Sequence, residues 1–593
     1  MIASTYQLIT TPDALRTAVE SLSQQPAVGF DTETTSLDPY SGRIRLVQFA
    51  APGGQVFIID LDRFTDGDAH GSDALALLRQ LLAAPRPVKV AHNAKFDAKW
   101  VKHQLGVELG GLFDTLLASQ LISAGETEDR HGLQVVVERY LNETVDKAEQ
   151  LSDWSGALSE AQLDYAARDA AVMLPLRDAL ITRLKADGLV QVAQLEFECV
   201  VSVACLELAG IFLDKERWRE QIAIVKQKRA VLAEELQAML AEGTMQGSLF
   251  ANARADINLD SHTQLTAALK RLGVPLPDST RNWKLQPLAK DYKVIEVLLD
   301  YRTVQKSLTS YGENILDEIN PKTGRIHANF HQIGAPTGRF ACTNPNVQQV
   351  PHAVEYRRAF RAPEGRKLVI ADYSQIELRI LAHVTEDQGF IEAFNSGADL
   401  HRVTAAQIFN APLADVTKEQ RDFAKRLNFG VVYGIGAQRF SMMTGLSLAD
   451  AEAIMGRYFK TYRGLDAWLR AAAQRALRER SARTLSGRLA RFSFDPEDRQ
   501  AASLAQRNGK NMPIQGASAD ILKRALRLLH DQLRDTSARI VNIVHDEIVV
   551  ETDVDQAEET AKVVEDAMCK AGEEFVKKVP VKVETQVADE WVK

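Results

Sequence analysis

Acidic residues recur at short spacings in the first third of this 593-residue chain. Asp31 and Glu33 end the strand-like run AVGFDTET, and side chains at i and i+2 of a strand share one face. Asp97 follows a second strand-like run, VKVAHN. Tyr165 and Asp169 stand four residues apart in a helical segment, so they share a helix face. Each taken alone is most simply a solvated surface group.

Four carboxylates in one cleft repel one another and remain anionic only beside cations. Oxygen ligands without Cys or His suit Mg²⁺ or Mn²⁺. Two such ions can activate water and stabilise the leaving oxygen of a phosphodiester, and Tyr165 would orient that water. These acids therefore predict metal-dependent hydrolysis, with four structural acids of an α/β domain as the alternative.

A second pair of acids stands far along the chain. Asp372 comes directly after the apolar run of LVIADYSQIELRI, and Asp546 lies in a tight turn, His545 to Glu547, between the strand-like halves of IVNIVHDEIVVET. An aspartate at such a strand end must point into a cleft, because burying it unpaired is costly. Together the two would form a second metal site. For either acid alone, neutralisation by a basic helix is the alternative.

The segment between these acids carries a mixed helical stripe. Arg421, Lys425, Phe429 and Tyr433 follow at steps of four, within a stripe of about 120° on an α-helix. Core-facing stripes are normally apolar. Two cations followed by two aromatic rings suit a triphosphate at one end and a base at the other. The alternative is a surface helix with partly buried aromatic rings.

Composition limits the class of protein. Hydrophobic residues make up 45% and charged residues 25%, as in ordinary globular proteins. The net charge is −8, with the acidity concentrated in the first 190 residues. The four cysteines (Cys199, Cys205, Cys342, Cys569) form no CxxC pair, which argues against a zinc site or a disulfide framework. Lacking a leader or a long apolar run, the chain is expected to be soluble and cytoplasmic, with no membrane contact.

The order of elements predicts several domains. Residues 1–190 alternate strand-like and helical runs, which indicates an α/β domain with a mixed sheet. Residues 190–240 have a helical pattern, and residues 241–290 are polar and irregular, as in loops between helices. Beyond residue 360 strands and helices mix, around a long helical region from Asp399 to Leu529.

Three motifs of the first third resemble a nuclease family. DTETTSL, HNAKFD and YAARD are similar to the exonuclease motifs of the DEDD superfamily in its tyrosine variant. The resemblance implies a ribonuclease H-like 3′-5′ exonuclease domain whose metal ligands are Asp31, Glu33, Asp97 and Asp169. It also implies that Leu37 and Asn93 contact the 3′-terminal nucleotide.

The remaining motifs resemble the family A DNA polymerases of the bacterial DNA polymerase I type. ADYSQIELRI, RDFAKRLNFGVVYG and VHDEIV are similar to motifs A, B and C, and TGRFACTNPNVQQVP, DLHRVTAAQIF and RNGKNMPIQGASADILK are further matches. The implied fold class is multidomain α/β and α+β, with the exonuclease followed by a right-hand polymerase and no 5′ nuclease. The expected bounds are exonuclease 1–190 and polymerase 191–593, the latter with thumb about 200–320, palm about 321–400 and 500–593, and fingers about 400–500.

The polymerase resemblance implies roles at the catalytic centre. Asp372 and Asp546 would hold two Mg²⁺ ions, for which Mn²⁺ can substitute, with Glu547 as an auxiliary acid. Lys425 would also protonate the leaving pyrophosphate. Glu377 would exclude a ribose 2′-OH, and Phe429 rather than tyrosine implies discrimination against dideoxynucleotides. The complete set expected at the nucleotide is Arg421, Lys425, Phe429, Tyr433, His401, Gln375 and Glu377.

A further set is expected to read the minor groove of the primer–template: Arg339, Arg507, Asn511, Gln515 and His545. The sequence departs from the usual family pattern nearby. Phe340, Ala341 and Cys342 replace more usual residues beside Arg339, and Gln349 stands where asparagine is usual.

The function expected is template-directed DNA synthesis from dNTPs with proofreading, in replication or repair. The protein is expected to be a monomer whose partners are primer–template DNA and dNTPs. A processivity factor and a separate 5′ nuclease are possible additional partners. The cytoplasmic location would be the nucleoid, or the host cytoplasm for a phage enzyme. Three rivals are a single-subunit RNA polymerase, a nuclease whose second half only binds nucleic acid, and a non-catalytic scaffold. Glu377 and the exonuclease motifs disfavour the first, and intact Asp372, Asp546 and Lys425 disfavour the second. The third would require the loss of one of the acids, and none is lost.

Overall fold

The computed structural model describes residues 5–64, 75–125, 130–144, 149, 152–242, 257–276, 279–351 and 354–592. The chain divides into two compact units, which are described separately: the first comprises Met1–Gly210, His327–Gln348 and Gly365–Ala588, and the second Ile211–Ile326, Gln349–Glu364 and Asp589–Lys593. Among the described residues, no helix is long and apolar enough to cross a bilayer.

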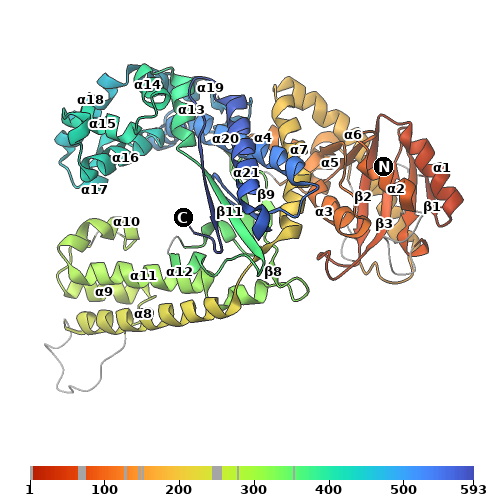
Figure 1. The fold of residues 1–593 in the computed structure, drawn as a ribbon, viewed down its shortest axis with the longest axis horizontal. Coiled ribbons are helices and arrows are strands. Elements are labelled where there is room, and N and C mark those ends of the chain that lie inside the picture. The colour runs from red at the N-terminus through yellow and green to blue at the C-terminus, as the bar shows by residue number, and fades with distance from the viewer. Residues whose placement is uncertain are drawn as a thin grey trace. The chain divides into compact units, whose positions relative to one another are not determined.

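A six-stranded mixed sheet begins the first unit (Figure 1). Its order is β1-β4-β3-β2-β5-β6, with β3 antiparallel to both its neighbours and the other pairs parallel. The strands are β1 (Thr5–Ile9), β2 (Ala27–Thr34), β3 (Ile44–Ala50), β4 (Gln55–Asp60), β5 (Val88–Ala91) and β6 (Leu112–Asp114). The mixed sheet expected from the sequence is therefore confirmed, although the edge strands β1 and β6 were not predicted.

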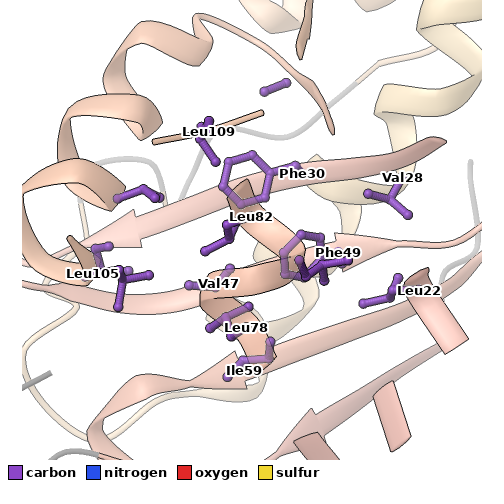
Figure 2. Packing of buried hydrophobic residues seen from close by; sticks show 14 of the residues in the cluster. Leu22, Val28, Phe30, Val47, Phe49, Ile59, Leu78, Leu82, Leu105 and Leu109 are labelled. Carbon is purple, nitrogen blue, oxygen red and sulfur yellow. The ribbon is translucent and has the colours of Figure 1, made fainter. Parts of the chain in front are cut away.

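Apolar side chains from this sheet pack against helices to form the first core. Phe30 and Val28 on β2, Phe49 and Val47 on β3, and residues such as Leu78 are almost completely buried there (Figure 2). The helices of this part are α1 (Pro12–Ser23), α2 (Ala76–Ala83), α3 (Ala94–Trp100) with a π turn at Val101–Leu105, α4 (Thr115–Ser123), α5 (Leu133–Leu141), α6 (Glu160–Ala186) and α7 (Val190–Ala209).

A four-stranded sheet forms the second core of the same unit. Its order is β14-β15-β11-β16, and every neighbouring pair is antiparallel. Its strands are β11 (Arg366–Tyr373), β14 (Arg539–Val544), β15 (Glu547–Asp553) and β16 (Val583–Ala588), and a separate pair is β9 (Asn329–His331) with β10 (Ala341–Thr343). Helix α21 (Ala557–Phe575) packs on β11 and β16, and it also packs against α20 (Arg499–Leu533). Glu547 belongs to β15, so the predicted turn is shorter than expected and ends at Asp546.

The helical region between β11 and β14 is less continuous than predicted. Its helices are α13 (Ile376–Thr385), α14 (Gln388–Asn395), α15 (Leu400–Phe409), α16 (Lys418–Val432), α17 (Ala437–Thr444), α18 (Leu448–Thr461), α19 (Arg463–Glu479) and α20. A hairpin of β12 (Ser481–Arg483) and β13 (Leu489–Arg491) interrupts them. The prediction of one helical region missed this hairpin because each of its strands has only three residues.

The second unit is mainly helical. It contains α8 (Lys215–Glu242), α9 (His262–Arg271), α10 (Asn282–Leu285), α11 (Lys293–Tyr311), α12 (Val354–Arg357) and the short strands β7 (Ile211–Phe212) and β8 (Arg325–Ile326). The prediction that residues 241–290 are loops is wrong for α9, whose Leu265, Ala268 and Leu269 enter the core on one helix face. Residues 243–256 of that predicted loop lie outside the described residues.

Candidate active sites

The four acids of the first constellation lie together at one end of the six-stranded sheet. Asp31 and Glu33 stand on β2, Asp97 on α3 and Asp169 on α6. Helix α6 lies very close to β2: a β-carbon added to Gly29 would be 2.2 Å from the carbonyl oxygen of Ala170. A glycine two residues before Asp31 thus brings the helix carrying Asp169 against the strand.

Electrostatics show that these carboxyls share one environment. Burial, with repulsion from Glu33, Asp97 and Asp169, raises the pKa of Asp31 well above its ordinary value. Burial and the charges of Asp169 and Asp97 raise the pKa of Glu33 to about 9. Burial raises the pKa of Asp97 to about 7, although the Thr32 hydroxyl donates a hydrogen bond of 2.6 Å to its Oδ1. The raised pKa values mean that these buried carboxyls are costly to ionise without a cation beside them. Such a set of oxygen donors has the chemistry of a site for hard divalent cations.

The other exonuclease predictions fall around this set. Tyr165 lies one turn before Asp169 on α6, and burial together with that carboxyl raises its pKa. Asn93 precedes α3 in a left-handed conformation, with φ of 60°. Leu37, four residues after Glu33, is 83% exposed, so its apolar side chain stands in solvent. These positions suit contacts with a nucleotide.

Asp114 is a supporting residue that sequence reasoning missed. Its carboxylate accepts the backbone N–H groups of Ala94, Leu116 and Leu117 at 2.8, 2.8 and 3.1 Å. It therefore caps the starts of both α3 and α4 and fixes the helix that carries Asp97. The sequence signal was an aspartate directly before the helical run TLLASQLIS.

The polymerase acids meet at one end of the second sheet. Asp372 on β11 is opposite Glu547 on β15 in the sheet register. Asp546 lies in the turn before β15, and its carbonyl oxygen accepts the backbone N–H of Tyr373 at 3.4 Å. The structure thus brings Asp372 and Asp546, predicted from segments far apart in sequence, to adjacent positions. Glu547 itself is almost fully buried at 1% exposure, which fits an auxiliary position better than a ligand in the cleft.

The mixed stripe lies on helix α16. Lys425 is exposed, Arg421 and Phe429 are half-buried, and Tyr433 follows the last helical residue with 38% exposure. The stripe is therefore an accessible face, as expected for ligand contacts and unlike a core seam. It differs from the prediction only in that Tyr433 is the C-terminal cap of the helix, not a residue within it.

Helix α15 places His401 beside this stripe. Its ring centroid lies 5.7 Å from that of Phe429. Asp399 caps α15 by accepting the His401 backbone N–H at 2.9 Å, and its other oxygen pairs with Arg421 Nε at 2.6 Å. One carboxylate therefore fixes both the start of α15 and the guanidinium of α16.

Glu377, Arg339 and Tyr433 form a further cluster. Glu377 on α13 is 8% exposed and pairs with Arg339. Burial raises the pKa of the Tyr433 hydroxyl to about 12, with Glu377 contributing and Arg339 opposing. Gln375 precedes α13 in a left-handed conformation with φ of 58°, and its buried Oε1 has no hydrogen-bond partner among the described residues.

Three of the predicted minor-groove residues lie on one face of α20, at steps of four. Arg507 is exposed, and its side chain passes close to Gly434. Asn511 Nδ2 donates to the Tyr433 carbonyl at 3.4 Å, and Gln515 is half-buried one turn later. His545 is exposed in the turn between β14 and β15, with φ of 58°. Arg507 and Asn511 therefore adjoin the C-terminal end of α16.

A buried ionic cluster supports the segment that carries Arg339. It consists of Glu196 on α7, Arg488 before β13, and Asp520 and Lys523 on α20, none more than 2% exposed. Lys523 pairs with Glu196 and donates to the Gly338 carbonyl at 2.7 Å. A β-carbon at Gly338 would collide with the Arg488 guanidinium at 2.5 Å.

The unusual residues beside Arg339 belong to the same surroundings. The Phe340 ring lies 5.5 Å from Lys523 Nζ, so this departure from the family pattern packs against the cluster. Cys342 on β10 is buried and donates to the Pro345 carbonyl at 3.4 Å.

One further group of residues has the atoms of a metal site. Within the described part of the chain, Glu108, Cys205 and His530 bring their ligand atoms within 4.8 Å of one another. Lys102 and Arg534, however, pair with Glu108 at 3.0 and 3.3 Å, so its charge is already neutralised. Burial also raises the pKa of the Cys205 thiol to about 12, which disfavours the thiolate that metals bind. The group is better understood as an ion-paired junction of α7 and α20 with the exonuclease part.

Comparison with known proteins identifies a family for each of the two parts of the chain. Residues 226–593 match DNA polymerase family A, and residues 6–185 match a 3′-5′ exonuclease domain. The chain belongs to DNA polymerase family A. The family, and the order of exonuclease before polymerase that the motifs predicted, are thereby confirmed.

Relatives match along nearly the whole chain. It is 33% identical to DNA polymerase I of Pseudomonas aeruginosa, over 97% of this chain and 64% of that protein. It is 32% identical to DNA polymerase I of Aquifex aeolicus, over 99% of this chain and 100% of that protein. It is also similar to a solved structure of the polymerase domain of Pol1 from M. smegmatis in complex with DNA primer-template and dNTP, with a TM-score of 0.85, 27% identity and 99% of both chains covered.

Proposed function

We propose that this protein extends a primer 3′-OH with dNTPs on a DNA template and removes mismatched 3′ ends with its exonuclease. The observation that carries the proposal is the presence of two separate carboxylate sites in one compact unit. One contains Asp31, Glu33, Asp97 and Asp169, and the other contains Asp372 and Asp546. Each site has the oxygen donors that magnesium requires.

At the exonuclease site, the four acids would hold two Mg²⁺ ions, or Mn²⁺ in their place. Bound there, such ions supply an activated water and charge stabilisation for phosphodiester hydrolysis. Tyr165, beside Asp169, would orient that water. Leu37 and Asn93 would hold the 3′-terminal nucleotide, the exposed leucine through apolar contact with its base.

At the polymerase site, Asp372 and Asp546 would be the metal ligands, with Glu547 supporting them from the buried strand β15. Arg421 and Lys425 would bind the triphosphate through charge-assisted hydrogen bonds, joined by His401. Lys425, the exposed cation of the stripe, would give a proton to the departing pyrophosphate. Phe429 would pack on the sugar and base, and Gln375 would use its unpartnered oxygen near the nucleotide.

Selection would depend on the cluster around Glu377. Its carboxylate, held by Arg339 and near Tyr433, would block a 2′-OH and so favour dNTPs over rNTPs. Tyr433 would stack by the template base and move as the fingers close. Arg339, Arg507, Asn511, Gln515 and His545 would contact the primer–template minor groove.

The domain bounds proposed are exonuclease 1–190 and polymerase 191–593, with thumb about 200–320, palm about 321–400 and 500–593, and fingers about 400–500. The protein would be a monomer in the cytoplasm, and its partners would be primer–template DNA and dNTPs. The role would be replication or repair, with a processivity factor or separate 5′ nuclease as additional partners.

Primer extension with an Asp372→Ala variant tests the assignment. We expect synthesis to be lost while degradation of 3′ ends continues, because Asp31 and its partners are untouched. Retained synthesis would refute the polymerase site, and loss of both activities with normal folding would refute two separate sites. Efficient extension with rNTPs by the wild type would instead favour an RNA polymerase.

A further inference from the structure

A buried hydrogen-bond chain in the fingers leads to His401. The hydroxyls of Tyr462 and Thr404 lie 2.9 Å apart, and Asn428 Nδ2 lies 3.1 Å from Thr404 Oγ1. The same Nδ2 lies 3.0 Å from His401 Nδ1. All four side chains are at most 2% exposed. Asn428 sits one residue before Phe429 but on the inner face of α16, so it cannot contact a nucleotide.

The atoms of this chain define where the histidine proton lies. An amide NH₂ only donates, so His401 Nδ1 must accept, and a neutral ring then carries its hydrogen on Nε2. His401 Nε2 takes no part in this buried chain, which uses only Nδ1 of the ring. It is therefore an available donor.

The surroundings keep the ring neutral. Burial, together with the cations Arg421 and Lys425, lowers the pKa of His401 to about 4, against the opposing charges of Asp399 and Asp422. The nearby positive charges thus belong to α16, and the histidine adds a directed hydrogen bond. The opposite tautomer would present a lone pair to phosphate oxygens.

We infer that Asn428 is a positioning residue for the incoming nucleotide, because its amide holds His401 as the neutral Nε2–H tautomer that donates to the triphosphate. This inference rests on the triphosphate role proposed for His401. It also separates the roles of these residues: Arg421 and Lys425 attract the triphosphate by their charge, and His401 donates a hydrogen bond of fixed direction to it. The Thr404 hydroxyl lies 3.1 Å from the amide nitrogen and 3.3 Å from the amide oxygen, and with the Tyr462 hydroxyl it holds the amide in place.

The variant Asn428→Asp tests this role with almost no change of shape. A carboxylate only accepts, so His401 Nδ1 must then carry a proton. The ring would be an imidazolium at low pH and a neutral Nδ1–H tautomer at high pH, which has no donor at Nε2. We expect the KM ratio, which is the KM of the variant for dNTP divided by that of the wild type, to rise with pH. It should reach about tenfold to a hundredfold once the ring is neutral. Exonuclease rates should not change.

Two controls separate positioning from damage to the fold. Asn410→Asp introduces the same charge at an exposed site at the end of α15, and its KM ratio should stay level with pH. In a His401→Gln background, Asn428→Asp should no longer introduce a pH-dependent KM. An increase in KM by the same factor at every pH would overturn the inference, since that is what a structural role produces.

Nitrogen-15 NMR of histidine-labelled protein reads the tautomer directly, with the His401 resonances identified by the His401→Gln variant. We expect a protonated Nε2 and an unprotonated Nδ1 in the wild type, and a protonated Nδ1 in Asn428→Asp. A protonated Nδ1 in the wild type would overturn the inference. If His401→Gln leaves the KM for dNTP unchanged, the proposed triphosphate role of His401 fails, whichever tautomer is found.

Discussion

A β-carbon added to Gly29 would lie 2.2 Å from the carbonyl oxygen of Ala170. This contact sets how closely helix α6 lies on strand β2, and so how closely Asp169 lies to Asp31. Real β-carbons do not approach a carbonyl this closely, so any side chain here must push the helix away.

Gly29→Ala should therefore impair the exonuclease selectively. Overpacking of this kind costs about 1–3 kcal/mol of stability, and a shift of α6 would separate the metal ligands. We expect a loss of 3′-end degradation of at least about tenfold, with synthesis close to wild type. Gly156→Ala is the matched control, because a β-carbon there meets nothing within 4 Å. Equal losses of both activities would contradict the local explanation.

The raised pKa values of the exonuclease acids predict how stability depends on pH without metal. Folded Asp97 and Glu33 have pKa values of about 7 and about 9, above those of the unfolded chain. The folded protein then binds more protons than the unfolded chain, so this part of the stability is complete in acid and is lost as pH rises through those values. In EDTA, the melting temperature should fall from about pH 5 to pH 9.

Mg²⁺ should reverse this fall, with a stabilisation that grows with pH because the cation replaces bound protons. Thermal unfolding of the wild type with and without Mg²⁺ measures the effect. Glu33→Gln leaves the polymerase acids intact and should show a smaller pH dependence. Parallel curves with and without metal would mean that the four acids do not bind it.

The buried ionic cluster predicts a large stability effect far from both sites. Burial alone would raise the pKa of Glu196, but Lys523 and Arg488 hold it below its ordinary value. Glu196→Gln leaves these cations with one carboxylate, and breaking such a buried arrangement costs about 3–5 kcal/mol. We expect a large fall in the free energy of unfolding, and weaker primer binding because Lys523 holds the Gly338 carbonyl beside Arg339.

Glu198→Gln on the same helix is the control for that change. Its side chain is 38% exposed, and its ion pair with Arg524 is long, at 3.7 Å. We therefore expect the free energy of unfolding to fall by at most about 1 kcal/mol. Denaturant unfolding compares the two variants. If both variants lose a similarly small amount of unfolding free energy, the buried ionic cluster does not contribute strongly to stability.

Removal of the Glu377 carboxylate should relax sugar selection. The side chain is buried, pairs with Arg339 and lies near Tyr433, so it has little freedom to move away from a 2′-OH. For Glu377→Ala we expect the preference for dNTP over rNTP, measured as a ratio of kcat/KM, to fall by about a hundredfold. A ratio that stays at the wild-type value would exclude Glu377 as the steric gate.

The sequence could predict much of this fold because the catalytic segments are long and strongly patterned. Strand β2 with Asp31 and Glu33, and helix α16 with its mixed stripe, were both found from local spacing. Strand β1 was missed because only Ile9 of its five residues is buried, so it lacks the alternation that identifies strands. Helix α9 was missed because its surroundings are polar.

The supporting residues were beyond sequence reasoning for a different reason. Asn428 contacts His401, 27 positions away, and Asp114 fixes the start of α3 through Ala94, 20 positions away; no local pattern reveals these partners, although the cap that Asp114 gives α4 is local. Glu196 and Lys523 are 327 residues apart and meet only in the folded chain. Buried polar residues of this kind appear as ordinary helix residues until their partners are known.

The joint action of the two sites as proofreading is tested most directly by primers with matched and mismatched 3′ ends. We predict that the wild type removes the mismatched nucleotide before extending, and that Asp31→Ala extends matched primers normally but leaves the mismatch in place. Mismatch removal by Asp31→Ala at the wild-type rate would contradict the account.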